Sequence, residues 1–223
     1  MRDRSKAVMS WSTGKDAAFA LHEILRTGEV DVVGILTTMT TAFGRVSMHG
    51  VREVLLDQQA DALGLPCWKV PIPSPCPNEV YEREMGRVLA ELQRIGVTEV
   101  IYGDLFLEDL RTYRESKLAE IGMKALFPLW RRDTSELATS MIASGLRATI
   151  TCIDPKRLDH SFAGRAFSSA FLDELPDGID PCGENGEFHS FVSAGPMFQH
   201  PIAITVGEVV ERDGFVFADV LPA

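Results

Sequence analysis

The 223-residue sequence has few cysteines and no long hydrophobic run. No two cysteines form a C-x-x-C pair, and the cysteines are too few for a secreted disulfide scaffold. No apolar run approaches the roughly 20 residues that span a bilayer, and the first residues lead into no signal-peptide core. These absences predict a cytoplasmic protein with free thiols and no membrane partner. The four cysteines are Cys67, Cys76, Cys152 and Cys182.

Basic residues are also scarce, because 22 Lys and Arg stand against 32 Asp and Glu, giving a net charge of -10. Nucleic-acid surfaces need clustered Lys and Arg, so this charge argues against a nucleic-acid partner. The hydrophobic content of 45% is ordinary for a globular protein. The length allows a sizeable core in one large domain or one and a half. Length, composition and net charge do not indicate the oligomeric state.

Strand-like apolar runs alternate with helical patterns through the first 130 residues. The expected strands are 7–9, 32–37, 68–72, 99–102 and 125–129. The expected helices are 15–26, 51–63, 79–95 and 110–121. This alternation predicts an α/β fold with a doubly wound, mostly parallel sheet that helices cover on both faces.

The alternation weakens after about residue 129. A helix is expected at 135–143 and a strand at 148–153. Near the end, 202–210 and 215–220 flank the turn Arg212-Asp213-Gly214 and predict a β-hairpin. We therefore expect a smaller C-terminal α+β region and divide the chain into residues 1–130 and 131–223.

The segment S-W-S-T-G-K-D-A, residues 10–17, joins the first expected strand to the first expected helix. In a parallel sheet such a loop lies at the ligand-binding edge, where a helix N-terminus offers N–H donors to a phosphate. Gly14 lets the backbone approach phosphate oxygens, Ser12 offers a hydroxyl, and Lys15, expected to be exposed, adds a positive charge. An ordinary Ser/Thr-capped helix start is the alternative, and the Walker A spacing is absent.

The segment from Ser12 to Ala17 resembles the S-G-G-K-D-S loop of the PP-loop ATP pyrophosphatases, in the adenine nucleotide alpha hydrolase superfamily. Three further segments narrow the resemblance, over about residues 8–198, to the diphthine–ammonia ligase family and its prokaryotic relatives. It implies a Rossmann-like PP-loop ATP-binding domain over 1–130 and a family-specific substrate region over 131–223. The three segments are Gly103-Asp104-Leu105 with Glu108-Asp109 and Arg111, Pro128-Leu129-Trp130, and D-P-C-G-E-N-G-E-F-H at 180–189.

The resemblance implies an ATP site around the loop. Asp104 follows a strand expected beside the first, where it can hold Mg²⁺ with phosphate oxygens, although a helix-capping role is the alternative. Thr37 and Thr38 end the second expected strand, where this superfamily binds adenine, but β-propensity explains them equally well. His49 is also expected at the ATP site, and a purely structural role is the alternative for it. The expected ATP-binding residues are Ser10, Ser12, Thr13, Gly14, Lys15, Asp16, Ala17, Thr37, Thr38, His49 and Gly103.

Two loop residues depart from the family pattern. Thr13 stands where the family has its first loop glycine, and Ala17 where it has the closing serine. If position 13 has a left-handed backbone, a β-branched residue costs roughly 1–2 kcal/mol there. The missing serine hydroxyl forfeits about 1 kcal/mol of hydrogen bonding. These departures predict weaker ATP binding, unless Thr13 supplies the missing hydroxyl itself.

The turn Glu184-Asn185-Gly186-Glu187 places two carboxylates and an amide near His189. The carboxylates can share a site and raise each other's pKa, or bind an ammonium ion or a substrate amine; an exposed acidic turn is the alternative. The expected catalytic residues are Lys15, Asp104, Glu184 and Glu187. The expected substrate-binding residues are Glu108, Arg111, Gly183, Glu184, Asn185, Glu187 and His189.

The loop and the resemblance together predict an ATP-dependent amide-forming ligase of the diphthine–ammonia ligase type. It would adenylate a carboxylate for attack by ammonia or an amine, releasing AMP and pyrophosphate, with ATP and Mg as cofactors. The carboxylate belongs to a small molecule or to diphthine, a modified histidine on translation elongation factor 2. Two alternatives stay open: a nucleotide-binding module without turnover, which suits Thr13 and Ala17, and PP-loop sulfur transfer to RNA, which the charge and unpaired cysteines oppose.

Overall fold

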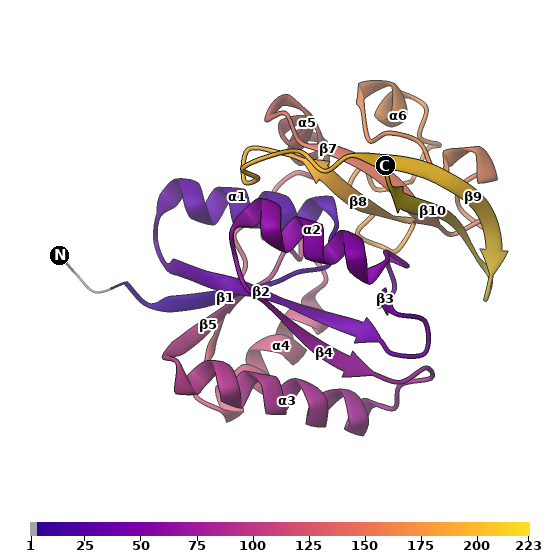
Figure 1. Cartoon of the computed structure of the whole chain (residues 1–223). Helices are drawn as coiled ribbons and strands as arrows, with labels where there is room; N and C mark the ends of the chain where they lie inside the picture. Colours follow the sequence, from indigo (N-terminus) through magenta and orange to yellow (C-terminus); the bar gives the residue numbers. More distant parts are fainter. Residues whose placement is uncertain (1–3) are drawn as a thin grey trace.

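The computed structural model describes residues 4–223, and its first half alternates strands and helices as expected (Figure 1). The strands are β1 (Lys6–Ser10), β2 (Asp31–Thr40), β3 (Arg45–Val46), β4 (Cys67–Ile72), β5 (Val97–Ile101) and β6 (Lys124–Leu126). The helices are α1 (Lys15–Thr27), α2 (Glu53–Leu63), α3 (Asn78–Arg94) and α4 (Glu108–Glu120).

These strands form one mixed sheet. β4, β2, β1, β5 and β6 pair in parallel, and the short β3 runs antiparallel to the end of β2. Helices α1 and α2 cover one face and α3 and α4 the other (Figure 1), which buries strands such as β1 on both sides and explains their continuous apolar sequence. The predicted doubly wound, mostly parallel α/β sheet is confirmed.

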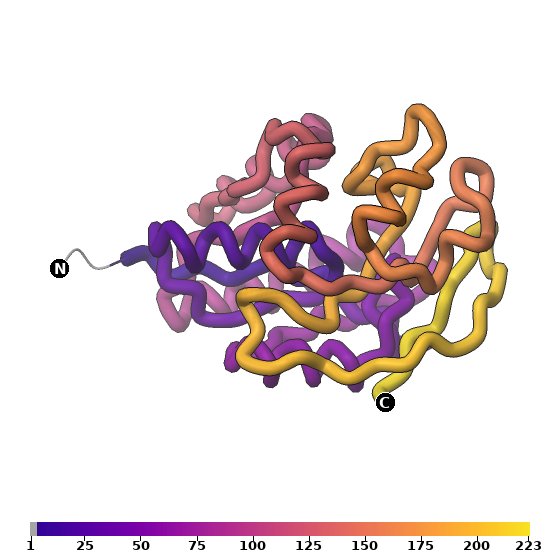
Figure 2. The backbone as a smooth tube through the Cα atoms, turned by 90° about the horizontal axis from the view of Figure 1, so that it is seen from above, coloured from indigo at the N-terminus to yellow at the C-terminus, as the bar shows by residue number. Residues whose placement is uncertain are grey.

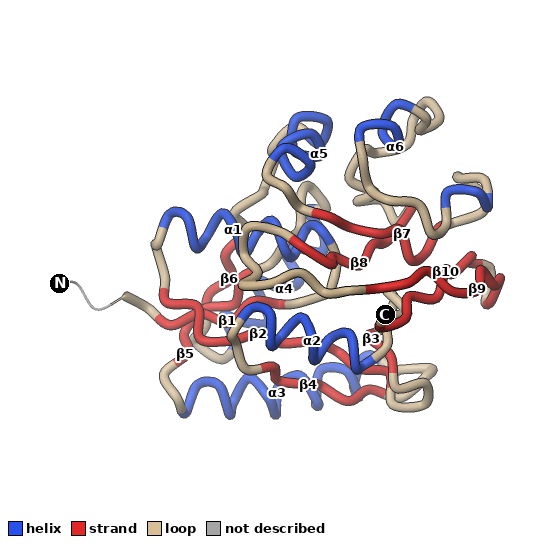
Figure 3. Tube along the Cα trace, turned by 45° about the horizontal axis from the view of Figure 1, so that its top comes forward, coloured by secondary structure: helices blue, strands red, loops and turns tan. Residues whose placement is uncertain are grey.

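The C-terminal region forms a second, antiparallel sheet in the order β8-β7-β10-β9 (Figure 3). It lies over α1 and α2, and seen from above its yellow C-terminal segment passes across α2 (Figure 2). The predicted β-hairpin is present as β9 and β10. The elements are α5 (Thr134–Ala143), β7 (Arg147–Ile153), the 3-10 turn His160–Phe162, α6 (Ser169–Asp173), β8 (Phe188–Ala194), β9 (Ile204–Arg212) and β10 (Phe215–Pro222).

The two sheets share one hydrophobic core. Leu21 of α1 and Leu55 of α2 belong to the same buried cluster as Ile150 and Phe191 of the second sheet. A separate cluster lies on the opposite face of the first sheet, between β5 and the helices α3 and α4. Within residues 4–223 no helix is both long and apolar enough to cross a membrane.

Strand β2 continues to Thr40, beyond its expected end at residue 37. It does so because β4 pairs with it in parallel, and this pairing places Lys69 and Val70 opposite Thr37 and Thr38. The expectation that these two threonines end the strand was therefore wrong. Both lie inside a regular strand, where β-branched residues are favoured.

Candidate functional site

A cleft of about 400 Å³ lies at the carboxyl ends of β1 and β5 and beside β2, and the C-terminal region closes one side of it. The carboxyl ends of parallel strands are where open α/β sheets bind ligands. The cleft brings the loop after β1 next to the acidic turn, although the two are far apart in the sequence. The expected site residues that line it are Ser10, Ser12, Lys15, Asp16, Ala17, Thr38, His49, Gly103, Asp104, Gly183, Glu184 and His189.

Thr13 has a left-handed backbone, with a φ of 72°. A β-branched residue in this conformation costs roughly 1–2 kcal/mol, so the family glycine at this position has a physical reason. The Thr13 side chain is fully buried, and among the described residues its hydroxyl finds no hydrogen-bond partner. Since Thr13 does not line the cleft, it does not supply the hydroxyl that Ala17 lacks.

Side chains of α2 and β8 hold the loop after β1 in place. Gln59 of α2 is fully buried; its Oε1 accepts from Trp11 Nε1 at 2.8 Å, and its Nε2 donates to the Thr13 carbonyl at 3.1 Å. The Lys15 N–H donates to Ser190 Oγ of β8 at 3.2 Å. Gly14 is the N-cap of α1 and makes no side-chain cap bond, so the Ser/Thr-capped helix start does not occur. Ser190 thus takes the first N–H of the helix, and the rest of the helix N-terminus lies at the cleft, where anions bind to such ends.

Lys15 is buried, with 1% of its surface exposed, and the expectation of an exposed lysine was wrong. Its Nζ pairs with Asp16 at 2.9 Å and also donates to the Cys182 carbonyl. The ammonium lies over the rings of Phe188 and Phe167, 5.1 and 5.6 Å from their centroids. Burial alone would lower the pKa of Lys15, but the Asp16 carboxylate and other negative groups outweigh it and raise the pKa.

Three carboxylates approach one another at the same end of the cleft. Glu184 Oε1 accepts from the backbone N–H of Leu105 at 2.8 Å, which ties the acidic turn to the segment after β5. Burial raises the pKa of Glu184 to about 7, and the charges of Asp16 and Asp104 add to the rise. Glu184 thus gains or loses a proton near neutral pH, a property typical of a general acid or base.

Two glycines permit this close assembly. A Cβ on Gly103 would lie 2.8 Å from the backbone of Asp16 and Ala17, so only glycine lets the end of β5 touch the start of α1. Gly183 has a φ of 69°, and a Cβ there would lie 2.9 Å from the Phe188 carbonyl. Both positions therefore require glycine for backbone reasons.

His49 and His189 face each other across the cleft wall, with ring centroids 4.7 Å apart. Burial, followed by the charge of His189, holds the pKa of His49 well below its usual value. Burial and Lys15 lower the pKa of His189 to about 4. Both rings are therefore neutral at pH 7 and can accept a hydrogen bond from a substrate group.

Comparison with known proteins gives this cleft a context. The sequence profile described as the diphthamide synthase N-terminal domain matches residues 5–125, and that of the diphthamide synthase C-terminal domain matches residues 133–218. The chain belongs to the diphthamide synthase family. The first matched range contains the loop and Asp104, and the second contains the acidic turn.

Curated relatives of this diphthamide synthase family member are diphthine–ammonia ligases. The Danio rerio protein is 26% identical over 94% of this chain and 90% of its own length. The Homo sapiens protein is 24% identical over 94% of this chain and 86% of its own length. The Schizosaccharomyces pombe protein is 32% identical over 46% of this chain, which is 18% of its own length.

Several expected site residues do not line the diphthamide synthase cleft. Thr37 is buried, and its hydroxyl donates to the Trp11 carbonyl at 2.9 Å. Glu108 pairs with Arg131 on the surface. Arg111 lies over the rings of Phe127 and Trp130, 4.8 and 4.7 Å from their centroids. These three side chains have partners of their own and are not among the residues that line the cleft.

Glu187 also points away from the cleft. It is fully buried, accepts from the Asp180 N–H at 3.3 Å and from Asn185 Nδ2 at 3.1 Å, and lies 3.5 Å from Arg157 Nη1. Glu184 lines the cleft and Glu187 does not, and Gly186 between them has a φ of 83°. Glu187 holds the turn in place, and Asn185 is exposed at its tip.

Sequence reasoning missed Arg114 and the two tyrosines that line the cleft. Arg114 Nε lies 3.0 Å from Asp104 Oδ2, and its guanidinium lies 4.1 Å from the centroid of the Tyr102 ring. Tyr81 also lines the cleft. The position of Arg114 on the helix after Gly103-Asp104 was the available signal, since that helix begins at the ligand-binding edge.

The residues of the cleft offer a magnesium ion only part of its coordination. Asp104 Oδ2 is buried and lies 3.0 Å from Arg114 Nε, in an ion pair that lacks hydrogen-bond geometry, so a magnesium ion would compete with Arg114 for it. Such a carboxylate oxygen suits Mg²⁺, which binds one or two carboxylates together with phosphate oxygens. Within residues 4–223 no three His, Cys, Asp or Glu side chains form a ready metal site. Phosphate oxygens would have to complete the coordination.

The cysteines in the described chain are free thiols, as expected. Cys182 is buried below the loop, and burial raises its pKa well above the usual value. Burial raises the pKa of Cys152 to about 12. Neither thiol is therefore a reactive thiolate at neutral pH.

Proposed function

We propose that this chain is an ATP-dependent ligase that converts a carboxylate into an amide with ammonia as the nitrogen donor. The observation that carries the proposal is the hydrogen bond from the Leu105 N–H to Glu184. It joins the acidic turn to the segment after β5, beside the loop, so phosphate-binding and proton-transferring groups face one cleft. The names of the relatives, diphthine–ammonia ligases, support the same reaction class.

The proposed reaction has two steps. A carboxylate oxygen of the substrate attacks the α-phosphorus of ATP, which forms an acyl-adenylate and releases pyrophosphate. Ammonia then attacks the acyl carbon, the bond to AMP breaks, and the amide and AMP leave with one proton released. The N-terminus of α1 and Lys15 stabilise the charge that develops on the departing pyrophosphate.

Glu184 is the proposed acceptor of the proton released when ammonia attacks. Its pKa of about 7 makes it a matched base at neutral pH. The neutral rings of His49 and His189 orient the nitrogen nucleophile by accepting its hydrogen bonds. Asp104 would hold Mg²⁺, which, when bound, offsets phosphate charge.

Residues 1–130 are proposed to bind ATP and residues 131–223 the acceptor, which is diphthine on elongation factor 2 or a smaller carboxylate. A second candidate is a nucleotide-binding module without turnover, which Thr13 and Ala17 favour because one strains the loop and the other lacks a hydroxyl. Sulfur transfer has less support, because two of the cysteines are buried with raised pKa values.

Chromatography of the nucleotide products tests the proposal. The protein is incubated with ATP, magnesium, ammonium and either diphthine-bearing elongation factor 2 or a panel of carboxylates. AMP that forms only with one acceptor supports the ligase. ADP as the main product would exclude adenylation, and tight ATP binding without any product would favour the module.

A further inference from the structure

Arg114 of α4 is a cationic side chain of the cleft to which the proposed reaction assigns no role. Leu110 and Arg114 both line the cleft, and their spacing of four residues places them on one face of α4. Among the described residues of the cleft wall, Lys15 and Arg114 are the only Lys or Arg side chains. Lys15 is already bound to Asp16 and to the Cys182 carbonyl. The contacts of Arg114 therefore decide whether the cleft offers a triphosphate a second cation.

Arg114 and Asp104 form an ion pair that leaves both groups unsatisfied. Arg114 Nε lies 3.0 Å from Asp104 Oδ2, but the two atoms lack hydrogen-bond geometry. Both atoms are buried, and neither has a hydrogen-bond partner among the described residues. Since buried polar atoms are normally hydrogen-bonded, each of the two would gain from a better partner.

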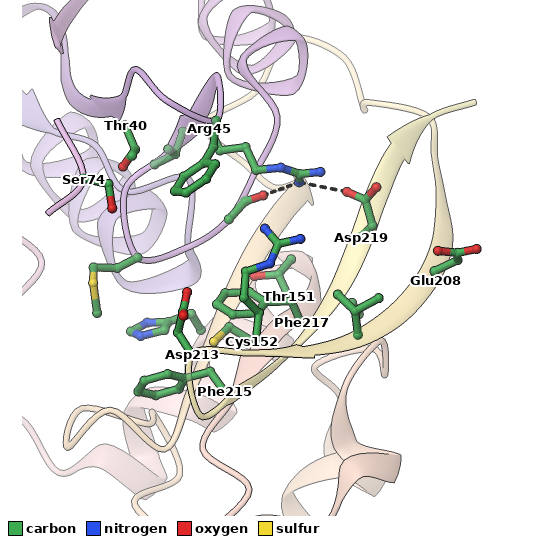
Figure 4. Close-up of a pocket in the computed structure, with 18 residues that line it drawn as sticks. Thr40, Arg45, Ser74, Thr151, Cys152, Glu208, Asp213, Phe215, Phe217 and Asp219 are labelled. Carbon is green, nitrogen blue, oxygen red and sulfur yellow. Dashed lines mark hydrogen bonds and ion pairs between the residues drawn. The ribbon is translucent and has the colours of Figure 1, made fainter. Parts of the chain in front are cut away.

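Arg45 shows how an arginine with a structural role is bound in this chain. It lines a second cavity, of about 420 Å³, between the end of the first sheet and the β9–β10 hairpin (Figure 4). Its Nη1 donates to Asp219 Oδ1 at 2.9 Å and to the Gly50 carbonyl at 2.6 Å, and these bonds join the hairpin to the first sheet. The pair of Arg114 and Asp104 lacks such bonds, so a purely structural role explains it less well.

The ring of Tyr102 holds the Arg114 guanidinium from one side. The guanidinium carbon lies over this ring, 4.1 Å from its centroid. An arginine on an aromatic face keeps its N–H groups directed outward in its own plane, where they match pairs of phosphate oxygens. The Arg114 side chain is 24% exposed, so a ligand in the cleft can reach it.

We infer that Arg114 binds a phosphate of the nucleotide, and that Asp104 exchanges Arg114 for Mg²⁺ when the nucleotide enters the cleft. The inference rests on the proposed function in one respect, namely that the ligand is ATP. The exchange keeps every charge paired, because Asp104 gains a divalent cation while Arg114 gains phosphate oxygens in place of one poorly aligned carboxylate.

This exchange couples the contribution of Arg114 to magnesium. With Mg²⁺ at Asp104, Arg114 is released and can give its N–H groups to phosphate at no cost to the carboxylate. Without Mg²⁺, Arg114 reaches a phosphate only by leaving Asp104 as an unpaired buried charge beside a second anion. Arg114 should therefore strengthen ATP binding much more in the presence of magnesium than in its absence. An arginine that acts only through the fold would contribute equally in both conditions.

Calorimetric titration with ATP, once in magnesium and once in EDTA, tests the inference on the whole chain. Arg114→Met removes the charge but keeps an unbranched stem, so it should bind ATP about tenfold more weakly in magnesium and less than about threefold more weakly in EDTA. Arg114→Lys keeps the charge without the paired N–H groups, so its affinity in magnesium should be intermediate. Arg111→Met is the matched control and should keep wild-type affinity, because Arg111 of the same helix lies over Phe127 and Trp130 and does not line the cleft.

An equal loss of ATP affinity in magnesium and in EDTA, or an unchanged affinity in Arg114→Met, would overturn the inference. Circular dichroism and urea unfolding of each variant confirm that it is folded at the temperature of the titration. AMP formation by the wild type, with unchanged ATP affinity in Arg114→Met, would keep the ligase and remove the inference. A magnesium-dependent loss of affinity in Arg114→Met, in a protein that forms no AMP with any acceptor, would keep the inference and remove the ligase.

Discussion

The Lys15 ammonium donates a hydrogen bond to the backbone carbonyl of Cys182, 167 residues further along the chain. The only lysine of the phosphate loop is thus bound to the C-terminal region as well as to Asp16. A lysine held in this way cannot be removed without consequences for the fold. It also has a fixed position before the nucleotide arrives.

Substitution of Lys15 should therefore affect stability and ATP binding separately. We expect Lys15→Ala to lower the free energy of unfolding by roughly 2–4 kcal/mol, because it empties the space beside Phe167 and Phe188 and leaves the Cys182 carbonyl unpaired. Lys15→Met keeps most of the apolar stem and should lose less stability, but should bind ATP roughly tenfold more weakly. Urea unfolding and calorimetry measure both, and Lys15→Met with wild-type ATP affinity would remove Lys15 from the nucleotide site.

Thr13→Gly should change the free energy of unfolding by less than about 1 kcal/mol. Relief of the left-handed strain offsets the entropy of glycine and the lost side-chain contacts. Thr149→Gly, on β7 at a position that is also buried, gains no such relief and should cost roughly 2 kcal/mol. Equal losses in the two variants, measured by denaturant unfolding, would show that the Thr13 conformation is not strained.

The raised pKa of Glu184 predicts that the free energy of unfolding depends on pH. The folded protein raises it to about 7 from 4.5, so between these values the folded state binds more protons than the unfolded state. Its contribution to stability therefore falls as the pH rises through this window, by at most about 3 kcal/mol. Glu184→Gln removes this loss, so its stability relative to wild type should increase from about pH 5 to about pH 8. A difference that stays constant with pH would contradict the raised pKa.

Glu184→Gln and Glu187→Gln should affect different properties, catalysis in the first and stability in the second. Glu184 faces the cleft, so its glutamine variant should lose roughly 100-fold in kcat while keeping its ATP affinity. Glu187 is bonded within the turn, so its variant should lose roughly 1–2 kcal/mol of stability and keep kcat per folded molecule. Steady-state kinetics and thermal unfolding of the pair provide matched controls for each other.

The sequence predicted the fold well because the relevant signals are local. Apolar runs such as that of β1 mark strands buried on both faces, and the glycines Gly28 and Gly64 end α1 and α2 in left-handed conformations. The expectation that the strand before Asp104 lies beside β1 is confirmed by the pairing of β5 with β1.

The candidate site was harder to predict because its decisive contacts are distant in the sequence. Lys15 is buried by Phe167, Phe188 and Cys182, and no local pattern at the loop reveals these partners. Glu184 and Glu187 are close in sequence, but Glu184 lines the cleft whereas Glu187 is fully buried outside it. Arg114 reaches the cleft only because α4 begins at its edge.

The loop after β1 takes its contacts from α2 and β8, through Gln59 and Ser190. Phe215 and Phe217 of the β9–β10 hairpin make none of these contacts and line a cavity of about 420 Å³ beside His189 of β8. Substitutions in the hairpin therefore leave the hydrogen bonds that hold the loop in place. The hairpin can thus differ between members of the family while the loop keeps its support.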